Sequence, residues 1–136
     1  RRQAVSESSV EWQQIMPLLQ VGNLLESLKY YTQVLGFAVI SLWPDEREPK
    51  WAHLARGKTR VMLTFDLGTS DRQFIAEKGN GVVLYVVVED VYAAYRELEE
   101  KGAIIVQELA EFGGQPQFSI TEPNGYVLAF VGGWNV

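Results

Sequence analysis

The chain has 136 residues and a mass of 15.4 kDa, with 47% apolar and 21% charged residues, which suits one domain with one hydrophobic core and excludes a mainly disordered chain. A net charge of −5 argues against a nucleic-acid-binding surface, and the absence of Cys excludes disulfides, Cys-ligated metal centres and thiol nucleophiles. No apolar run is long enough to cross a membrane. We therefore expect a cytoplasmic protein with neither nucleic acid nor membrane as a partner.

The first half of the chain predicts a strand, a helix and three more strands. The polar residues 1–14 are expected to be an N-terminal arm or a cloning remnant. Apolar residues predict a strand over 15–21, and helical spacing predicts a helix over 24–35 that ends at Gly36. Further strands are expected at 37–43, 51–55 and 60–65.

The second half repeats this order after a polar linker over 67–80. A strand is expected over 82–88, and Asp90 is placed to cap a helix that Gly102 ends. The remaining strands are expected at 104–106, 118–121 and 126–131. Both halves are therefore predicted to be βαβββ modules, which makes the fold class α+β.

The two halves align with each other at one spacing. Val88 matches Val21 and Leu128 matches Val61, and both differences (88 − 21 and 128 − 61) are 67. We interpret residues 15–132 as a single domain made of modules 15–66 and 81–132, followed by a tail at 133–136. A helix covers only one face of each sheet, so we expect the two sheets to meet around a shared concavity that holds the functional site.

Two segments resemble a known superfamily. The sequence VGNLLESLKYYTQVLGF at 21–37 resembles the first module of the vicinal oxygen chelate superfamily, and FSITEPNGYVL at 118–128 resembles its closing hairpin. The resemblance implies a glyoxalase/bleomycin-resistance-type pair of half-barrels. Because this superfamily includes glyoxalase I, extradiol dioxygenases, fosfomycin-resistance enzymes and bleomycin-resistance proteins, the fold does not settle the function.

The enzymes of this superfamily hold a divalent metal with His or Glu at equivalent places in the two modules. In this sequence those places fall on Met16, Met62, Val83 and Ala129, and the differences 83 − 16 and 129 − 62 are again 67. Apolar and thioether side chains cannot ligate a hard or borderline cation. We therefore predict no metal, no other cofactor and no catalytic residue.

The sequence is most similar to the bleomycin-resistance branch, whose members bind a drug and do not catalyse a reaction. The resemblance implies a homodimer with ligand grooves formed by both chains, and a bulky cationic ligand. Trp43, beside the acidic residues Asp45, Glu46 and Glu48, is a candidate platform for such a ligand. The predicted function is metal-independent small-molecule binding, which would include sequestration of a cationic antibiotic.

Strand alternation sorts the side chains into two faces. The residues expected to face the cavity are Leu18, Gln20, Arg60, Met62, Thr64, Tyr85, Val87, Ser119 and Val127. Together with Trp43, the ligand-contact candidates are Gln20, Arg60, Met62, Thr64, Tyr85 and Ser119. By the same repeat, Trp51 and His53 match Phe118 and Ile120, and both are expected to face away from the cavity.

Two alternatives stay open at this point. The first is an atypical lyase, isomerase or dioxygenase-like enzyme of the same superfamily, in which Arg60, Tyr85 and His53 would act. The second is a subunit or regulatory domain whose cavity is filled by its own side chains, such as Met16, Met62 and Val83.

Overall fold

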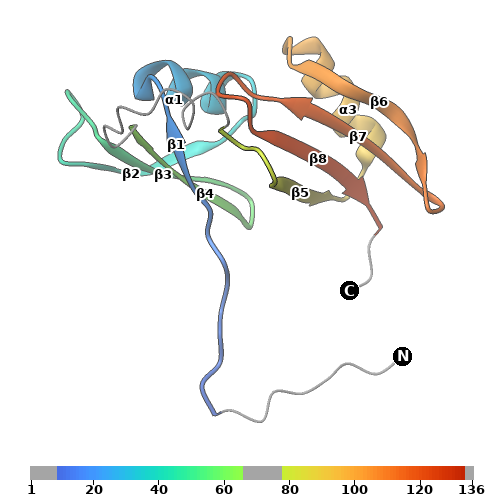
Figure 1. Ribbon diagram of the computed structural model, residues 1–136, viewed down its shortest axis with the longest axis horizontal. Helices are drawn as coiled ribbons and strands as arrows, with labels where there is room; N and C mark the ends of the chain where they lie inside the picture. The colour runs from blue at the N-terminus through green and yellow to red at the C-terminus, as the bar shows by residue number, and fades with distance from the viewer. Residues whose placement is uncertain (1–8, 66–77, 134–136) are drawn as a thin grey trace.

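In the computed structural model, which describes residues 9–65 and 78–133, each half of the chain forms a four-stranded sheet with one helix (Figure 1). The elements of the first module are β1 (Leu18–Val21), α1 (Leu24–Gln33), β2 (Ala38–Trp43), β3 (Trp51–Arg56) and β4 (Thr59–Phe65). Its strand order is β1-β4-β3-β2, in which β1 pairs with β4 in parallel and the other pairs are antiparallel.

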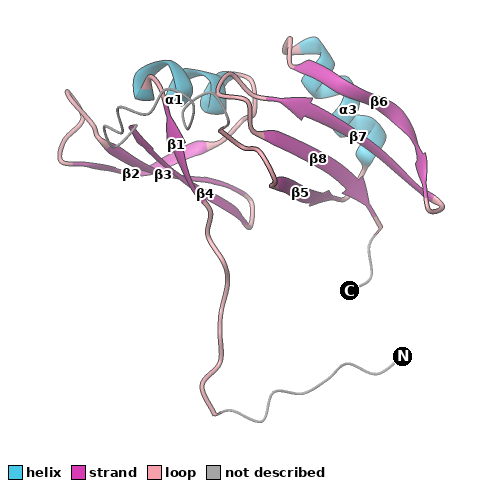
Figure 2. Cartoon of the chain, viewed as in Figure 1, coloured by secondary structure: helices cyan, strands magenta, loops and turns pink. Residues whose placement is uncertain are grey.

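The second module has the same topology (Figure 2). Its elements are β5 (Val83–Val88), α3 (Val91–Glu100), β6 (Ile104–Phe112), β7 (Gln115–Thr121) and β8 (Val127–Gly132). The strand order β5-β8-β7-β6 again places the parallel pair at one edge. The prediction of an α+β fold made of two βαβββ modules is therefore confirmed.

Both helices begin at the caps that the sequence predicts. The Asn23 carboxamide accepts a hydrogen bond from the backbone N–H of Glu26 at 3.0 Å, and the Asp90 carboxylate accepts two at the start of α3. Such caps satisfy backbone donors that have no partner within the helix. After the helices, Gly36 and Gly102 adopt φ values of +75° and +85°, which favour glycine and turn the chain into the next strand.

The hydrophobic core lies between each sheet and its helix. In the first module Leu54 and Leu63 of the central strands are fully buried, and Tyr31 of α1 is 1% exposed. In the second module Phe118 is fully buried, and its ring stacks on Phe130 with 4.9 Å between ring centroids. This burial of apolar side chains on one face of each sheet is the main stabilising term of the fold.

A buried carboxylate joins the modules at one end. Glu122 is 2% exposed and accepts hydrogen bonds from the backbone of Asn124 at 2.6 Å and of Tyr126 at 3.1 Å. The hydroxyl of Tyr31, in the first module, donates to the same carboxylate at 3.1 Å. Burial, and then the neighbouring Glu122 charge, raise the pKa of Tyr31 far above its usual range, so this hydroxyl stays a donor.

The hairpin that carries Glu122 makes further contacts with the first module. The Asn124 side chain accepts from the backbone N–H of Gly22 at 3.0 Å and donates to Ser27 Oγ at 3.1 Å. The Tyr126 hydroxyl donates to the backbone carbonyl of Gln20 at 2.8 Å. The EPNG turn of the closing hairpin therefore connects the two modules.

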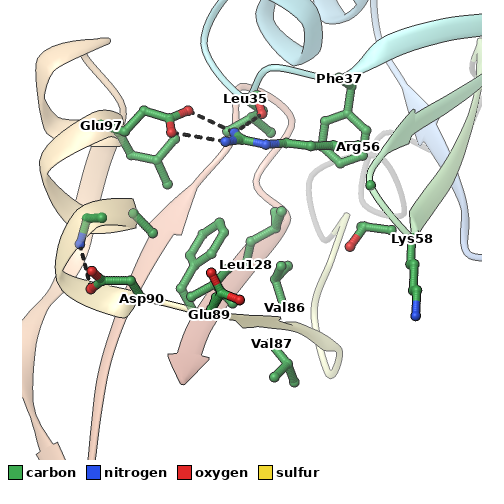
Figure 3. Close-up of a pocket in the computed structure, with 17 residues that line it drawn as sticks. Leu35, Phe37, Arg56, Lys58, Val86, Val87, Glu89, Asp90, Glu97 and Leu128 are labelled. Atoms are coloured by element: carbon green, nitrogen blue, oxygen red, sulfur yellow. Dashed lines mark hydrogen bonds and ion pairs between the residues drawn. The ribbon is translucent and has the colours of Figure 1, made fainter. Parts of the chain in front are cut away.

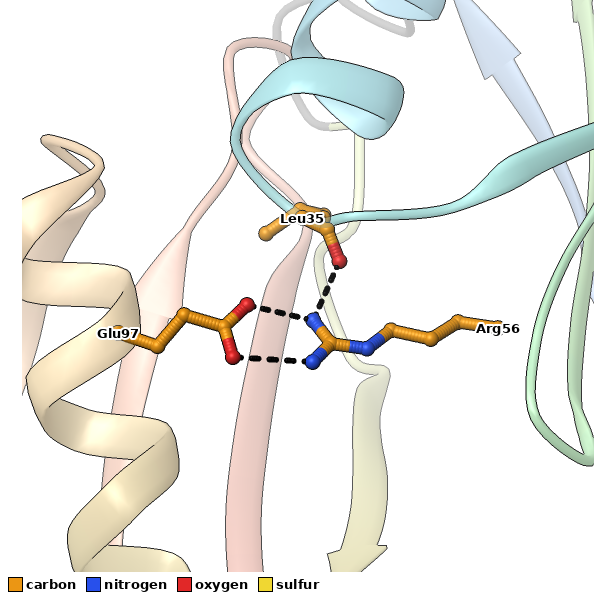
Figure 4. A network of polar contacts seen from close by, with 3 residues as sticks. All are labelled: Leu35, Arg56 and Glu97. Atoms are coloured by element: carbon orange, nitrogen blue, oxygen red, sulfur yellow. Dashed lines mark hydrogen bonds and ion pairs between the residues drawn. The ribbon is translucent and has the colours of Figure 1, made fainter.

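An ion pair joins the modules at a second place. Arg56, at the end of β3, donates to both carboxylate oxygens of Glu97 on α3, at 2.8 and 3.0 Å, and to the carbonyl of Leu35 at 2.9 Å (Figure 4). The hydrogen bond from Arg56 lowers the pKa of Glu97, and the same bond raises the pKa of Arg56. This geometry satisfies three donors of the Arg56 guanidinium.

Several predicted boundaries differ from the observed ones. β1 begins at Leu18 instead of 15, and β6 continues to Phe112 although its predicted strand ended at 106. Residues 9–13 run away from the body of the molecule (Figure 1), and Trp12 is 90% exposed, whereas the carbonyl of Pro17 accepts a hydrogen bond from the backbone N–H of Met62 at 2.9 Å. Most of the predicted arm, linker and tail lies outside the described residues, so the predicted domain boundaries stay predictions. None of the helices in the described ranges is long and apolar enough to cross a membrane.

Candidate functional site

The candidate site lies on the face of each sheet opposite its helix, which we call the open face. In antiparallel strands, residues directly opposite each other share a face. His53 on β3 lies opposite Met62 on β4, whereas Leu54, next to His53, lies opposite Val61 and is fully buried in the core. His53 and Met62 therefore both lie on the open face.

Strand register places the nine residues that the sequence predicts to face the cavity on one face of each sheet. In the parallel pair of the first module, Leu18 lies beside Met62 and Gln20 beside Thr64, while in the second module Ser119 lies beside Ala129. The nine residues that share the open faces are Leu18, Gln20, Arg60, Met62, Thr64, Tyr85, Val87, Ser119 and Val127. Contact of the candidates among them with a ligand stays a prediction.

The predicted facing of Trp51 and His53 is wrong. Trp51 lies opposite Thr64 on the open face, and its ring centroid is 6.2 Å from that of His53. The cause is a change of spacing within the repeat. Met62 follows its partner His53 by nine positions (62 − 53), whereas Ala129 follows its partner Ser119 by ten (129 − 119). His53 therefore matches Ser119 and not Ile120, and a shift of one residue reverses the face of a strand.

Trp43 and Trp51 form an aromatic pair at one end of the open face. They lie opposite each other in the β2–β3 register, and Trp43 is 61% exposed. Asp45, Glu46 and Glu48 follow Trp43 in an exposed loop, in which the Asp45 carboxylate accepts the backbone N–H groups of Arg47 and Glu48 at 2.9 Å. The loop also carries the cations Arg47 and Lys50, so this end of the face combines aromatic surface with three acidic residues and a net loop charge of −1.

Arg60 and His53 form a polar pair at the other end of β3 and β4. One guanidinium nitrogen of Arg60 lies 3.3 Å from Nε2 of His53. A guanidinium can only donate, so Nε2 of His53 is the acceptor in this contact. Among residues 9–65 and 78–133, Arg60 forms no ion pair with a carboxylate.

A polar network occupies the open face of the second module. The Gln117 carboxamide donates to the hydroxyl of Tyr85 at 3.3 Å and to Oε1 of Gln107 at 3.2 Å. Ser119 Oγ donates to the same Gln107 oxygen at 3.2 Å. The sequence reasoning missed Gln107 and Gln117. Gln117 could have been found from strand alternation, because it lies two residues before Ser119, whereas Gln107 lies next to irregularities in the β6–β7 register.

Two of the seven predicted site residues line one cavity. Arg60 from β4 and Tyr85 from β5 line a cavity of about 410 Å³ between the modules, together with Lys58. The remaining candidates lie elsewhere on the open faces, and they are Gln20, Trp43, Met62, Thr64 and Ser119. Thr64 is 7% exposed and donates to the carbonyl of Lys50 at 3.1 Å, so its hydroxyl proton is already used inside the protein.

A larger cavity of about 530 Å³ lies between the β3–β4 turn and α3 (Figure 3). Phe37, Val86 and Leu128 contribute to its apolar lining, and Arg56 and Glu97 form their ion pair at its edge. None of the seven candidate residues lines this cavity.

The superfamily's metal site does not fit the residues present. Met62 and Ala129 lie on the open faces, and Val83 lies beside Val127 at the edge of the second sheet. Hydrocarbon side chains have no lone pair for a cation, and a thioether is a poor ligand for a hard one. Within the described ranges, no three His, Asp or Glu side chains gather at a distance suited to a metal ion.

Comparison with known proteins gives a matching family model and a curated relative. The family model described as "Glyoxalase/Bleomycin resistance protein/Dioxygenase superfamily" matches residues 13–130. A curated protein of Vibrio cholerae serotype O1 named "Probable lactoylglutathione lyase" is 28% identical over 123 residues, which cover 84% of this chain and 86% of that protein.

Solved structures share the fold at lower identity. The bleomycin-binding protein of bleomycin-producing Streptomyces verticillus, solved with copper(II)-bleomycin, superposes with a TM-score of 0.69 at 17% identity, covering 92% of this chain and 99% of that one. TnmS3, an antibiotic binding protein from Streptomyces sp. CB03234, gives a TM-score of 0.70 at 16% identity, covering 94% and 100%. At such identities the likeness shows the fold alone.

Proposed function

The chain belongs to the Glyoxalase/Bleomycin resistance protein/Dioxygenase superfamily, and from this premise we propose that it is a metal-independent binding protein for a small organic molecule, of the bleomycin-resistance type. The observation that carries this proposal is the side-chain chemistry at the four places where the superfamily's enzymes hold a metal. Met16, Met62, Val83 and Ala129 stand there, and they cannot supply the three or so ligands of a catalytic cation.

The aromatic end of the open face supports a cationic aromatic ligand, such as an antibiotic. Trp43 is largely exposed and lies opposite Trp51, so a planar group can lie against indole surface. A cation over an indole face contributes about 0.5–2 kcal/mol, and the acidic residues at 45, 46 and 48 add long-range attraction. These contributions require no covalent step.

We further propose that the protein acts as a homodimer whose ligand grooves are completed by the partner. The open faces expose apolar side chains that the single chain does not cover, since Leu18, Val83 and Val87 are 50%, 51% and 53% exposed. Contiguous apolar surface of this kind favours association. Sedimentation equilibrium at micromolar concentration should give twice the monomer mass, and a monomer under these conditions would contradict the dimer.

The second candidate is a lyase or isomerase of the same superfamily. The name of the Vibrio cholerae relative favours it, and the contact between Arg60 and His53 brings a guanidinium and an imidazole together on the open face. This candidate predicts turnover that depends on His53, whereas the binding proposal predicts none.

The two candidates are separated by calorimetric titration. We expect metal-free bleomycin, or a member of a panel of cationic aromatic antibiotics, to bind saturably to the wild type. Binding should weaken in Trp43→Ala and stay unchanged in Trp12→Ala, which removes the exposed indole at position 12 instead. Stoichiometric binding of Zn²⁺ or Mn²⁺, together with turnover of the hemithioacetal of methylglyoxal and glutathione, would support the enzyme. No binding by any member of the panel would contradict the binding proposal.

A further inference from the structure

The geometry points to a second feature of the ligand: we propose that the cavity between the modules binds an organic carboxylate at Arg60. This inference rests on the proposed function, because Arg60 lies on the same open face as the aromatic pair Trp43 and Trp51. It adds an anionic group to a ligand that the aromatic end of the face suggests to be cationic.

The lining of the 410 Å³ cavity is unusual in a chain of net charge −5. It contains the two cations Lys58 and Arg60, and among its described lining residues there is neither Asp nor Glu. Its apolar lining comes from both modules and includes Phe37, Val83, and Leu128. A cavity with apolar walls and a few polar groups of one charge is suited to a ligand with an apolar body and an opposite charge at its head.

The hydrogen bonds of Arg60 leave donors for such a head group. A guanidinium has five N–H donors, and the contact with His53 Nε2 at 3.3 Å uses one of them. Arg56, four residues earlier, differs, because three of its five donors are taken by both oxygens of Glu97 and by the Leu35 carbonyl (Figure 4). Arg60 therefore has the capacity for a two-pronged contact with a carboxylate that Arg56 has already used inside the protein.

Three neighbours shape the place where the carboxylate would lie. His53 lies against the Arg60 guanidinium, with Nε2 at 3.3 Å from one of its nitrogens, and so helps to fix the position of this cation on the open face. Tyr85 lines the same cavity from the second module, and Gln117 donates to its hydroxyl at 3.3 Å. Lys58 lies exposed at the β3–β4 turn and adds positive potential at the rim.

The register also sets the length of a ligand that reaches both ends of the face. Thr64, opposite Trp51, is four residues beyond Arg60 on β4, which corresponds to about 13 Å along a strand. A molecule that fills both subsites therefore carries its carboxylate roughly that far from the aromatic, cationic part that stacks on Trp51.

Calorimetric titration with three eight-carbon probes of equal length tests the anion subsite. We expect the full chain to bind octanoate, and to bind octanamide and octylamine at least about tenfold more weakly, because charge-assisted hydrogen bonds to a guanidinium are lost. Arg60→Gln should weaken octanoate about tenfold or more, and Arg60→Lys should weaken it less because the charge is kept. Arg96→Gln, which makes the same change at an exposed position of α3 outside the cavity, should leave octanoate binding unchanged.

The outcomes separate this inference from the proposed function. Equal binding of octanoate and octanamide, absence of octanoate binding, or an unchanged affinity in Arg60→Gln would each overturn the carboxylate subsite. Drug binding that depends on Trp43 would still stand in those cases. Conversely, octanoate binding that depends on Arg60, in a protein that binds none of the antibiotics, would keep the subsite and reject the proposed ligand class. Thermal unfolding of each variant shows whether it is folded, and Arg60→Lys keeps the test valid if Arg60→Gln is not.

Discussion

Replacing Tyr31 by Phe should weaken the contact between the two modules without changing the shape of the core. The substitution removes one hydroxyl, which donates to the Glu122 carboxylate at 3.1 Å in a place where Tyr31 is 1% and Glu122 2% exposed. Glu122 would keep its backbone and Asn124 partners but would lose its hydrogen bond from Tyr31 of α1. A charged group would then remain buried with one acceptor position unsatisfied.

The size of the effect follows from this geometry. Hydrogen bonds to charged groups contribute about 1.5–3 kcal/mol to stability, so we expect Tyr31→Phe to lower the free energy of unfolding by about 2 kcal/mol. The entropy of unfolding for 136 residues is about 0.29 kcal/mol/K. The midpoint of thermal unfolding should therefore fall by about 7 °C.

Urea denaturation followed by circular dichroism, together with a thermal scan, measures both quantities. The matched control is Tyr92→Phe, because Tyr92 is 49% exposed on α3 and its substitution should cost less than about 0.5 kcal/mol. A double-mutant cycle with Glu122→Gln should give a coupling energy of about 1 kcal/mol or more. If Tyr31→Phe unfolds within about 0.5 kcal/mol of the wild type, the reasoning that this hydrogen bond joins the modules is refuted.

Two further predictions concern the core and the ion pair. Phe118→Ala should lower the free energy of unfolding by about 3–5 kcal/mol, because the fully buried ring stacks on Phe130 and meets Tyr95 edge-on at 5.2 Å. Phe112→Ala, at a 44% exposed position, is its control in urea denaturation, and similar losses for the two variants would contradict this description of the core. Glu97→Gln should cost at most about 1 kcal/mol at pH 7, since both side chains of the pair are partly exposed. Because Arg56 lowers the pKa of Glu97 in the folded state, the stabilisation is present above the ordinary value of 4.5 and is lost as the pH falls through the lowered value, so wild type and variant should be equally stable once the pH is below the lowered pKa. A difference that persists at that pH would show that Glu97 stabilises the fold by something other than its charge.

The order and type of the elements could be predicted from the sequence because local signals marked each of them. Helical spacing, the caps Asn23 and Asp90, and the glycines at 36 and 102 placed both helices. Strand ends were less accurate. The extension of β6 to Phe112 passes through Glu108 and Glu111, and charged residues on an edge strand resemble a loop in sequence although they protect the edge from pairing.

The faces of the strands could be predicted only where the repeat keeps its spacing. Residues on β1, β4, β5 and β8 follow the offset of 67, and the register groups them on the shared faces that strand alternation predicts. The offset that aligns β3 with β7 is one residue smaller than 67, because the second hairpin is one residue longer. The predicted facing of Trp51 and His53 is therefore reversed. The contact between His53 and Arg60 does not follow from the uniform offset, because that offset places His53 on the core face.

The contacts between modules were beyond the reach of sequence patterns. The EPNG turn predicts a hairpin, but no local pattern indicates that Glu122 accepts a hydrogen bond from Tyr31, which lies 91 positions earlier in the chain. Likewise, Arg56 and Arg60 are the same residue type and lie four positions apart. Their roles differ because Arg56 lies within hydrogen-bonding distance of Glu97, whereas Arg60 contacts His53. Such differences arise from tertiary structure alone.

The way in which the modules are joined has a consequence for assembly. Within the described ranges no strand of one sheet pairs with a strand of the other, and the contacts around Glu122 and Arg56 hold the modules together. A neighbouring copy could supply the same partners, so an exchanged pair of chains would lose no ladder of backbone hydrogen bonds. The joining of the two modules therefore depends on side-chain contacts and not on backbone pairing, and substitutions such as Tyr31→Phe are expected to weaken it within a chain and between chains alike.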